Sequence, residues 1–165
     1  MDKTDLLRRA YEFAHRNGLT LGDQLGAGVQ GIVWSAKSQS EEGRLAVKVH
    51  KQEPDYCRER DAYLRLREHK TTSIRGCNVP ELVDYDDELW IIQMTVVARP
   101  FVLDFGGAFL DRAPEFSEEI LAEWRAEKLE QFGTRWPDVQ AILSTLQSYG
   151  VFLIDVNPGN VSFGD

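Results

Sequence analysis

This sequence has few cysteines, no long apolar run and no excess of basic residues, and each of these features excludes a class of protein. Its two cysteines, Cys57 and Cys77, are far apart and have no metal-binding spacing, so we expect free thiols in a cytoplasmic protein. No apolar stretch approaches the length of a membrane-spanning helix, and the polar N-terminus does not resemble a signal peptide, so we expect no membrane partner. The formal net charge of −8 argues against a nucleic-acid partner, because contacts with phosphates need a basic surface.

Repeats, low-complexity tracts and long linkers are also lacking. The 165 residues are enough to bury one hydrophobic core, so we expect a single domain over residues 1–165.

The hydrophobic pattern predicts a helix over residues 4–17, ended by Gly18, followed by five strands with one helix among them. The predicted strands cover residues 19–25, 32–37, 45–50, 79–85 and 89–94, with the helix over 54–69 and a loop over 71–78.

The second half of the chain is predicted to be mainly helical. Ser117 is a good N-cap for a helix over 117–131, and we expect Ile120, Leu121 and Trp124 to point inward. A second helix over 137–149 is followed by a short apolar strand over 151–154. Strands followed by helices indicate an α+β fold.

Three glycines, Gly26, Gly28 and Gly31, lie between the first two predicted strands and are followed by Val33. Glycines allow backbone N–H groups to approach phosphates without a Cβ clash. A dinucleotide-binding fold would continue with a helix, whereas β-branched residues here continue as a strand. An ordinary glycine hairpin remains an alternative.

A lysine and a glutamate form the second candidate pair. Lys48 stands in an otherwise apolar strand, where a lysine is rarely buried without a partner. Glu59 precedes apolar residues on one face of the predicted helix 54–69, so we expect it to face the sheet and pair with Lys48; Glu53 and Glu68 are less well placed. The alternatives are a lysine that reaches solvent and a solvated glutamate.

Near the end of the chain, Asp155 and Asn160 follow a buried-looking strand in a turn tightened by Pro158 and Gly159. Asp155 is suited to orient a hydroxyl and accept its proton, and Asn160 to bind magnesium. The alternative is a local turn in which both side chains bond only nearby backbone.

From about residue 19 onward, these motifs in this order resemble the protein-kinase-like superfamily. The resemblance implies an N-lobe and hinge over 19–97, with a five-stranded antiparallel sheet and one αC-type helix, and a reduced, mainly helical C-lobe over 98–165. It implies that ATP and magnesium are cofactors and that Lys48, Glu59 and Asp155 are catalytic. The implied ATP-binding residues are Gly26, Gly28, Gly31, Val33, Ala46, Lys48, Met94, Thr95 and Val97, and the implied magnesium ligand is Asn160.

The chain also departs from the family pattern. Leu153 and Ile154 replace the His-Arg that precedes the catalytic aspartate, and no Asp-Phe-Gly follows Asn160. An Asp-Phe-Gly does occur at residues 104–106, but it precedes Asp155, so we expect Asp104 to contact the ribose or cap a helix rather than bind metal. Asp165 is another candidate for that metal role, but a strand over residues 161–164 would carry it about 15 Å from Asn160, so it is a poor candidate unless the chain folds back.

The predicted function is transfer of the γ-phosphoryl group of ATP to a hydroxyl of a protein or small molecule. The alternative is a pseudokinase that acts as a nucleotide-responsive or protein-binding module. The helices over 117–131 and 137–149 are expected to pack together or to form a homo-oligomer. A third possibility is one part of a split kinase.

Overall fold

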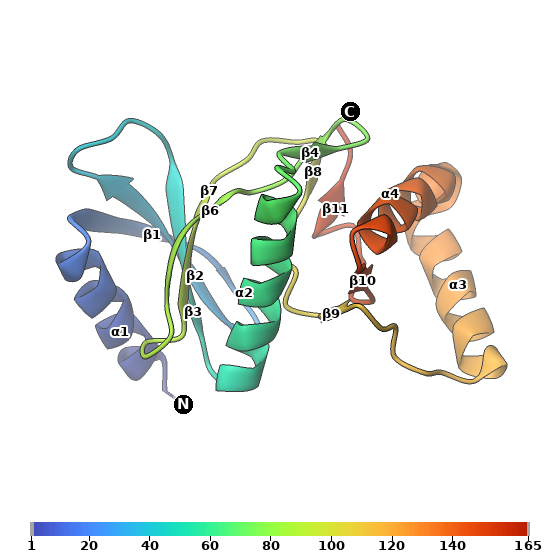
Figure 1. Ribbon diagram of the computed structural model, residues 1–165, viewed down its shortest axis with the longest axis horizontal. Coiled ribbons are helices and arrows are strands. Elements are labelled where there is room, and N and C mark those ends of the chain that lie inside the picture. The colour runs from blue at the N-terminus through green and yellow to red at the C-terminus, as the bar shows by residue number, and fades with distance from the viewer. Residues whose placement is uncertain (1, 165) are drawn as a thin grey trace.

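The structure is a computed structural model that describes residues 2–164, and its architecture is α+β (Figure 1). Its main sheet and the two helices beside it comprise α1 (Lys3–Arg16), β1 (Leu19–Ala27), β2 (Gly31–Ser38), β3 (Leu45–His50), α2 (Glu53–Glu68), β6 (Leu82–Asp86) and β7 (Ile91–Thr95). The order across the sheet is β1-β2-β3-β7-β6. Every neighbouring pair runs antiparallel, which confirms the predicted five-stranded sheet.

Side chains of the central strand β3 alternate between two hydrophobic layers. Val47 and Val49 are fully buried in the layer under α1, whereas Ala46 is buried in the layer under α2. Successive strand residues point to opposite faces, so Lys48 and His50 share the α2 side with Ala46. Figure 1 shows α1 and α2 on opposite faces of the sheet, and the alternation therefore brings Lys48 toward α2.

The helix α1 closes the outer face of the sheet. Its residues Leu6, Ala10 and Phe13 are buried at the helical spacing expected of an amphipathic helix. Arg9 on the same helix donates hydrogen bonds to the carbonyl of His50 at 2.7 Å and to that of Leu89 at 2.6 Å. The bond to His50 holds the end of β3, two residues after Lys48, against α1.

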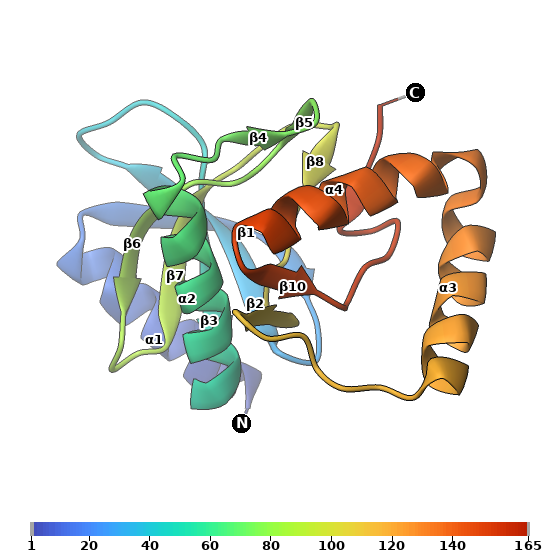
Figure 2. The ribbon, with the colours of Figure 1, turned by 45° about the vertical axis from the view of Figure 1, so that its right-hand side comes forward.

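The second half contains α3 (Glu118–Phe132), the short 3-10 helix η1 (Gly133–Arg135) and α4 (Trp136–Ser148). The Ser117 hydroxyl accepts a hydrogen bond from the N–H of Ile120 at 3.2 Å, which confirms the predicted cap. One side of α4 is buried in the same core as α2. The predicted inward position of Ile120 is wrong, because this residue is 51% exposed on a helix that stands away from the rest of the chain (Figure 2).

Short strands connect the two halves. They are β4 (Ser73–Ile74), β5 (Cys77–Asn78), β8 (Phe101–Val102), β9 (Ala108–Leu110), β10 (Val151–Leu153) and β11 (Val161–Ser162). β8 pairs with β11 and β9 pairs with β10, both antiparallel. The chain at 101–110 is therefore fixed on both sides of its central turn to the chain at 151–162.

The predicted loop over 71–78 contains β4 and β5, which pair with each other, and β5 continues parallel to β8. The fourth strand of the main sheet begins at Leu82 rather than at the predicted residue 79. Cys57 and Cys77 are both free thiols. Within the described part of the chain, no helix is both long and apolar enough to cross a membrane.

Candidate functional site

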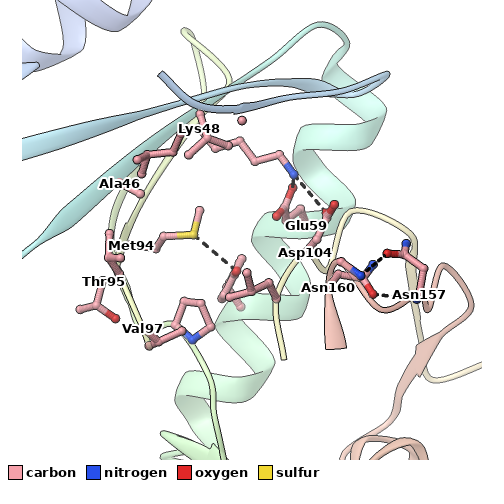
Figure 3. Close-up of a pocket in the computed structure, with 17 residues that line it drawn as sticks. Ala46, Lys48, Glu59, Met94, Thr95, Val97, Asp104, Asn157 and Asn160 are labelled. Atoms are coloured by element: carbon pink, nitrogen blue, oxygen red, sulfur yellow. Dashed lines mark hydrogen bonds and ion pairs between the residues drawn. The ribbon is translucent and has the colours of Figure 1, made fainter. Parts of the chain in front are cut away.

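A cavity of about 370 Å³ lies between the main sheet and the segments around Asp104 and Asn160 (Figure 3). We call it the hinge-side cavity. It brings together most of the residues singled out from the sequence, namely Gly26, Val33, Ala46, Lys48, Glu59, Met94, Thr95, Val97 and Asn160. Its accessible lining is mostly apolar, as is usual for small-molecule sites.

A second cavity, of about 580 Å³, lies under the turn between β1 and β2. We call it the glycine-side cavity. Lys48, Asp104 and Asp155 line it together with the whole turn from Gly26 to Gly31. The two cavities share Lys48 and Asp104, so together they form one continuous region from β7 to Asp155.

The three glycines have different structural roles. A Cβ placed on Gly26 or Gly28 would meet no atom within 4 Å, so the backbone there is open to the cavity. A Cβ on Gly31 would overlap the carbonyl oxygen of Val49 on the neighbouring strand. Gly31 is therefore required by the close approach of β2 and β3, while Gly26 and Gly28 leave room for a ligand.

Lys48 and Glu59 form a buried ion pair, with 2.6 Å between Lys48 Nζ and Glu59 Oε2. Their side chains are only 8% and 1% exposed. Burial by itself would lower the pKa of Lys48 and raise the pKa of Glu59. The attraction between the two opposite charges outweighs burial, so the pKa of Lys48 is raised and the pKa of Glu59 falls to about 2. Both groups are therefore charged at neutral pH.

His50 extends this pair. Its Nε2 lies 2.7 Å from Glu59 Oε2, and its Nδ1 lies 3.2 Å from the carbonyl oxygen of Trp90. Both ring nitrogens thus face oxygen atoms, one of a carboxylate and one of a backbone carbonyl. His50 is completely buried and contacts the same oxygen of the Glu59 carboxylate, Oε2, as Lys48 does.

Asp104 joins the same cluster, which sequence order did not lead us to expect. Its Oδ1 lies 3.1 Å from Lys48 Nζ, and its charge helps to raise the lysine pKa. Its backbone φ is +62°, a left-handed conformation uncommon for residues other than glycine. The expected helix-cap role is wrong, because Asp104 lies between β8 and β9 with no helix adjoining it.

The neighbours of Asp104 explain how it reaches the lysine. The N–H of Leu103 donates to the carbonyl of Asn160 at 2.7 Å, in line with the β8–β11 pairing. Phe105 is fully buried and meets Tyr63 of α2 edge-on, with ring centroids 5.3 Å apart. Asp104 is thus held between a backbone pairing on one side and an aromatic anchor on the other.

The turn at Asp155–Asn160 places its two polar side chains differently. The Asn160 amide is buried; it donates to the carbonyl of Asp155 at 2.8 Å and accepts from the N–H of Asn157 at 2.9 Å. Asp155 is exposed and lines the glycine-side cavity. A Cβ on Gly107 would meet the Cβ of Asp155 at 2.8 Å, so a glycine there allows the two segments to pack closely.

The edge of β7 presents one free backbone donor to the hinge-side cavity. The N–H of Thr95 already donates to the carbonyl of Glu81 at 3.0 Å. Among the described residues, the N–H of Val97 makes no hydrogen bond to another backbone group. Of Thr95 and Val97, both implied by the resemblance to bind ATP, Val97 is therefore the one with an available backbone N–H.

Sequence reasoning missed five apolar lining residues: Leu25, Tyr63, Pro80, Val96 and Leu103. Leu25 and Leu103 adjoin Gly26 and Asp104, so adjacency to a polar motif was the available signal. Tyr63 lies one helical turn after Glu59, at a spacing that puts both on one face. Its hydroxyl lies 3.5 Å from the Met94 sulfur (Figure 3).

No protein-family model matches this chain. No curated protein sequence matches it significantly. Within residues 2–164, no three His, Cys, Asp or Glu side chains cluster closely enough to hold a metal ion by themselves. Asp165 lies outside the described residues. A metal in this site would therefore need ligands from a bound molecule in addition to those of the protein.

Proposed function

We propose that this protein binds ATP and magnesium in a kinase-like site and transfers the γ-phosphoryl group to a hydroxyl. The observation that carries the proposal is the convergence of Lys48, Glu59 and Asp104 below an open glycine turn, with Asp155 lining the same cavity. These groups come from four separate parts of the chain. Phosphoryl transfer depends mostly on such positioning and on charge stabilisation.

The shape and lining of the two cavities suit a nucleotide. Val33, Ala46 and Leu103 provide apolar walls for a base in the hinge-side cavity, and the N–H of Val97 provides a donor. In the glycine-side cavity, the lack of side chains at Gly26 and Gly28 leaves space for phosphates, although the Gly28 N–H itself donates to the carbonyl of Gly31 at 2.9 Å. Lys48 contributes the positive charge between the two compartments.

The protein groups suited to magnesium are the Asp104 carboxylate and the Asn160 amide oxygen. Magnesium in phosphate sites takes one or two protein ligands and completes its shell with phosphate oxygens and water. The Asn160 Oδ1 accepts one backbone N–H and keeps a second lone pair. When bound, the ion supplies positive charge that offsets the charge of the transferring phosphate.

Asp155 is the proposed base because it is exposed to the glycine-side cavity and makes no side-chain hydrogen bond to a described residue. It orients the acceptor hydroxyl and takes its proton as the hydroxyl oxygen bonds the γ-phosphorus and ADP departs. Glu59 and His50 position Lys48 without touching the substrate. In this scheme, every side chain acts from the side of the main sheet on which it already lies.

Two variants test the proposal. Asp155→Asn should leave ATP binding intact and lower phosphate transfer by about 10²–10⁴-fold, since it removes the base. Lys48→Ala should abolish magnesium-enhanced ATP binding in calorimetric titration. The exposed residues Asp23 and Lys37 offer matched controls, Asp23→Asn and Lys37→Ala, which should change neither quantity. Transfer that is unchanged in Asp155→Asn would exclude the proposed chemistry.

A nucleotide-binding module without transfer is the second candidate. It is favoured by one observation: both polar ends of the Asn160 amide already bond the local turn. In that case ATP binding would depend on Lys48 but not on magnesium, and no acceptor would be phosphorylated. The same calorimetric titration, made with and without magnesium, separates the two candidates.

A further inference from the structure

A third cavity, of about 490 Å³, lies between α3, α4 and the segment that leads into α3 (Figure 2). We call it the α3–α4 groove. Its lining is mostly apolar and includes Phe116, Ile120, Trp124, Leu143 and Ile154. No residue of the groove belongs to the two cavities described above.

The groove is open because α3 packs on the rest of the chain through few side chains. Trp124 and Phe132 both contact Trp136, with ring centroids 5.7 Å and 6.2 Å apart. Phe116 and Ile120, nearer the start of the helix, are 43% and 51% exposed. Large apolar side chains gathered on an open groove are typical of a binding surface rather than of a solvated helix.

One flank of the groove is strongly acidic. Four glutamates recur at helical spacing and share the side of α3 next to Ile120, namely Glu119, Glu123, Glu127 and Glu130. All four are exposed, and among the described residues only Glu127 has a cation partner, Lys128 at 3.3 Å. The one charged residue that lines the groove itself is Arg125, while the four glutamates lie beside the groove and do not line it. This flank, rather than the lining, therefore complements the positive charges of a partner.

The groove also adjoins the proposed base. Phe152, Leu153 and Ile154 line it, and the next residue, Asp155, lines the glycine-side cavity. One residue of extended chain spans roughly 3.3 Å. A segment lying in the groove would therefore pass within a few residues of the place where phosphate transfer is proposed.

We propose that the α3–α4 groove binds the acceptor, and that the acceptor is a protein segment with apolar side chains flanked by lysine or arginine. The apolar side chains would bury against Ile120 and Phe116, and the basic ones would lie along the glutamates of α3. A serine or threonine of the segment would reach Asp155. This last step rests on the proposed phosphotransferase function, whereas the binding of the segment does not.

A second copy of this chain is a less suitable occupant. Two copies would bring like charges together, since the chain has a net charge of −8 and the flank of the groove is acidic. An acidic partner is disfavoured for the same reason. Many amphipathic segments could bind in an apolar groove, and the glutamates of α3 favour one that is basic.

The test uses a short fluorescein-labelled peptide in which a central serine is flanked by alternating leucine and arginine. A matched peptide carries glutamate in place of each arginine. Fluorescence anisotropy should show binding of the basic peptide at least about 10-fold tighter than binding of the acidic one, with weakening at high salt. The surface variant Ile120→Ser should weaken binding by about 5-fold or more, as expected for loss of a buried aliphatic side chain.

Two further variants separate the groove from the catalytic proposal. Glu119→Gln with Glu123→Gln should weaken binding of the basic peptide without weakening binding of the acidic peptide, whereas Asp155→Asn should leave peptide binding unaltered. Equal binding of both peptides, or no effect of Ile120→Ser, would overturn the groove assignment even if the protein transfers phosphate. Self-association that is lost in Ile120→Ser would overturn it too, because the groove would then be an interface between copies. Tight peptide binding without phosphorylation of the serine would overturn only the proposed transfer.

Discussion

At the scale of single residues, the site is governed by charge balance around Lys48. Two carboxylates, Glu59 and Asp104, lie within ion-pair distance of its ammonium group, and His50 contacts the same oxygen of Glu59 as Lys48 does. Glu59 is much the more deeply buried of the two carboxylates, so its charge is stabilised by its neighbours rather than by water. Asp104 is the most exposed and is the one able to exchange its lysine partner for a ligand.

The depressed pKa of Glu59 predicts a specific dependence of stability on pH. Its folded pKa is about 2 against an ordinary value of 4.5, so its contribution is fully present above about pH 4.5 and is lost as pH falls toward 2. The contribution is on the order of 3 kcal/mol, since each unit of pKa difference is worth about 1.4 kcal/mol. Glu59→Gln should therefore lower the free energy of unfolding at neutral pH and flatten its decline in acid.

Urea unfolding at several values between about pH 6 and pH 3 measures this decline, because the unfolding midpoint reports stability at each pH. The exposed Glu119→Gln is the control and should keep the slope of the natural protein. If the unfolding midpoints of Glu59→Gln and of the natural chain fell in parallel with pH, the pKa of Glu59 would not be lowered by its ion pair, and the prediction would be wrong.

At the scale of elements, regular periodicity was enough to predict the long helices and the five strands of the main sheet. Lys48 and Glu59 were paired correctly because one lies in an alternating strand and the other on the apolar face of a helix. Strands of two residues, such as β8 and β11, contain no such period and were missed. Their pairing places Asp104 beside Lys48. The position of Asp104 therefore depends on contacts between segments far apart in the sequence, which local sequence patterns cannot predict.

The turn between β1 and β2 offers a prediction for this element. Gly31→Ala should destabilise the fold by about 1–3 kcal/mol, because the new methyl group would overlap the carbonyl of Val49 and force the strands apart. Gly28→Ala meets no protein atom and should leave unfolding nearly unchanged, while it weakens ATP binding. Thermal unfolding and calorimetric titration of both variants measure the two effects. Equal destabilisation by both substitutions would contradict the division of roles between these glycines.

At the scale of the whole molecule, one hydrophobic core links the sheet to the second half of the chain. Tyr63 of α2, Met94 of β7 and Phe105 belong to the same buried cluster as Ile142 of α4 and Val151 of β10. The hinge-side cavity lies against this cluster, with walls from both halves. The two halves are therefore expected to unfold together rather than as separate units.

This arrangement predicts how a ligand changes the stability of the entire chain. A ligand that binds only the folded state at about 100 times its Kd stabilises it by about 2.7 kcal/mol. For a chain of this size, that corresponds to a rise in Tm of about 5–10 °C. ATP with magnesium should produce such a shift in a single transition seen by both tryptophan fluorescence and circular dichroism.

Lys48→Ala should show no shift with ATP, and Lys37→Ala should show the full one, because only Lys48 reaches the cavity. A shift confined to one of two separate transitions would mean that the halves fold independently and that the ligand contacts one of them. A single transition that moves with ATP requires the glycine turn, β7 and the segments at Asp104 and Asn160 to be held in place together. That requirement follows from the pairing of β8 with β11 and the bond from Leu103 N–H to the carbonyl of Asn160, since both join the segment at Asp104 to the loop that carries Asn160.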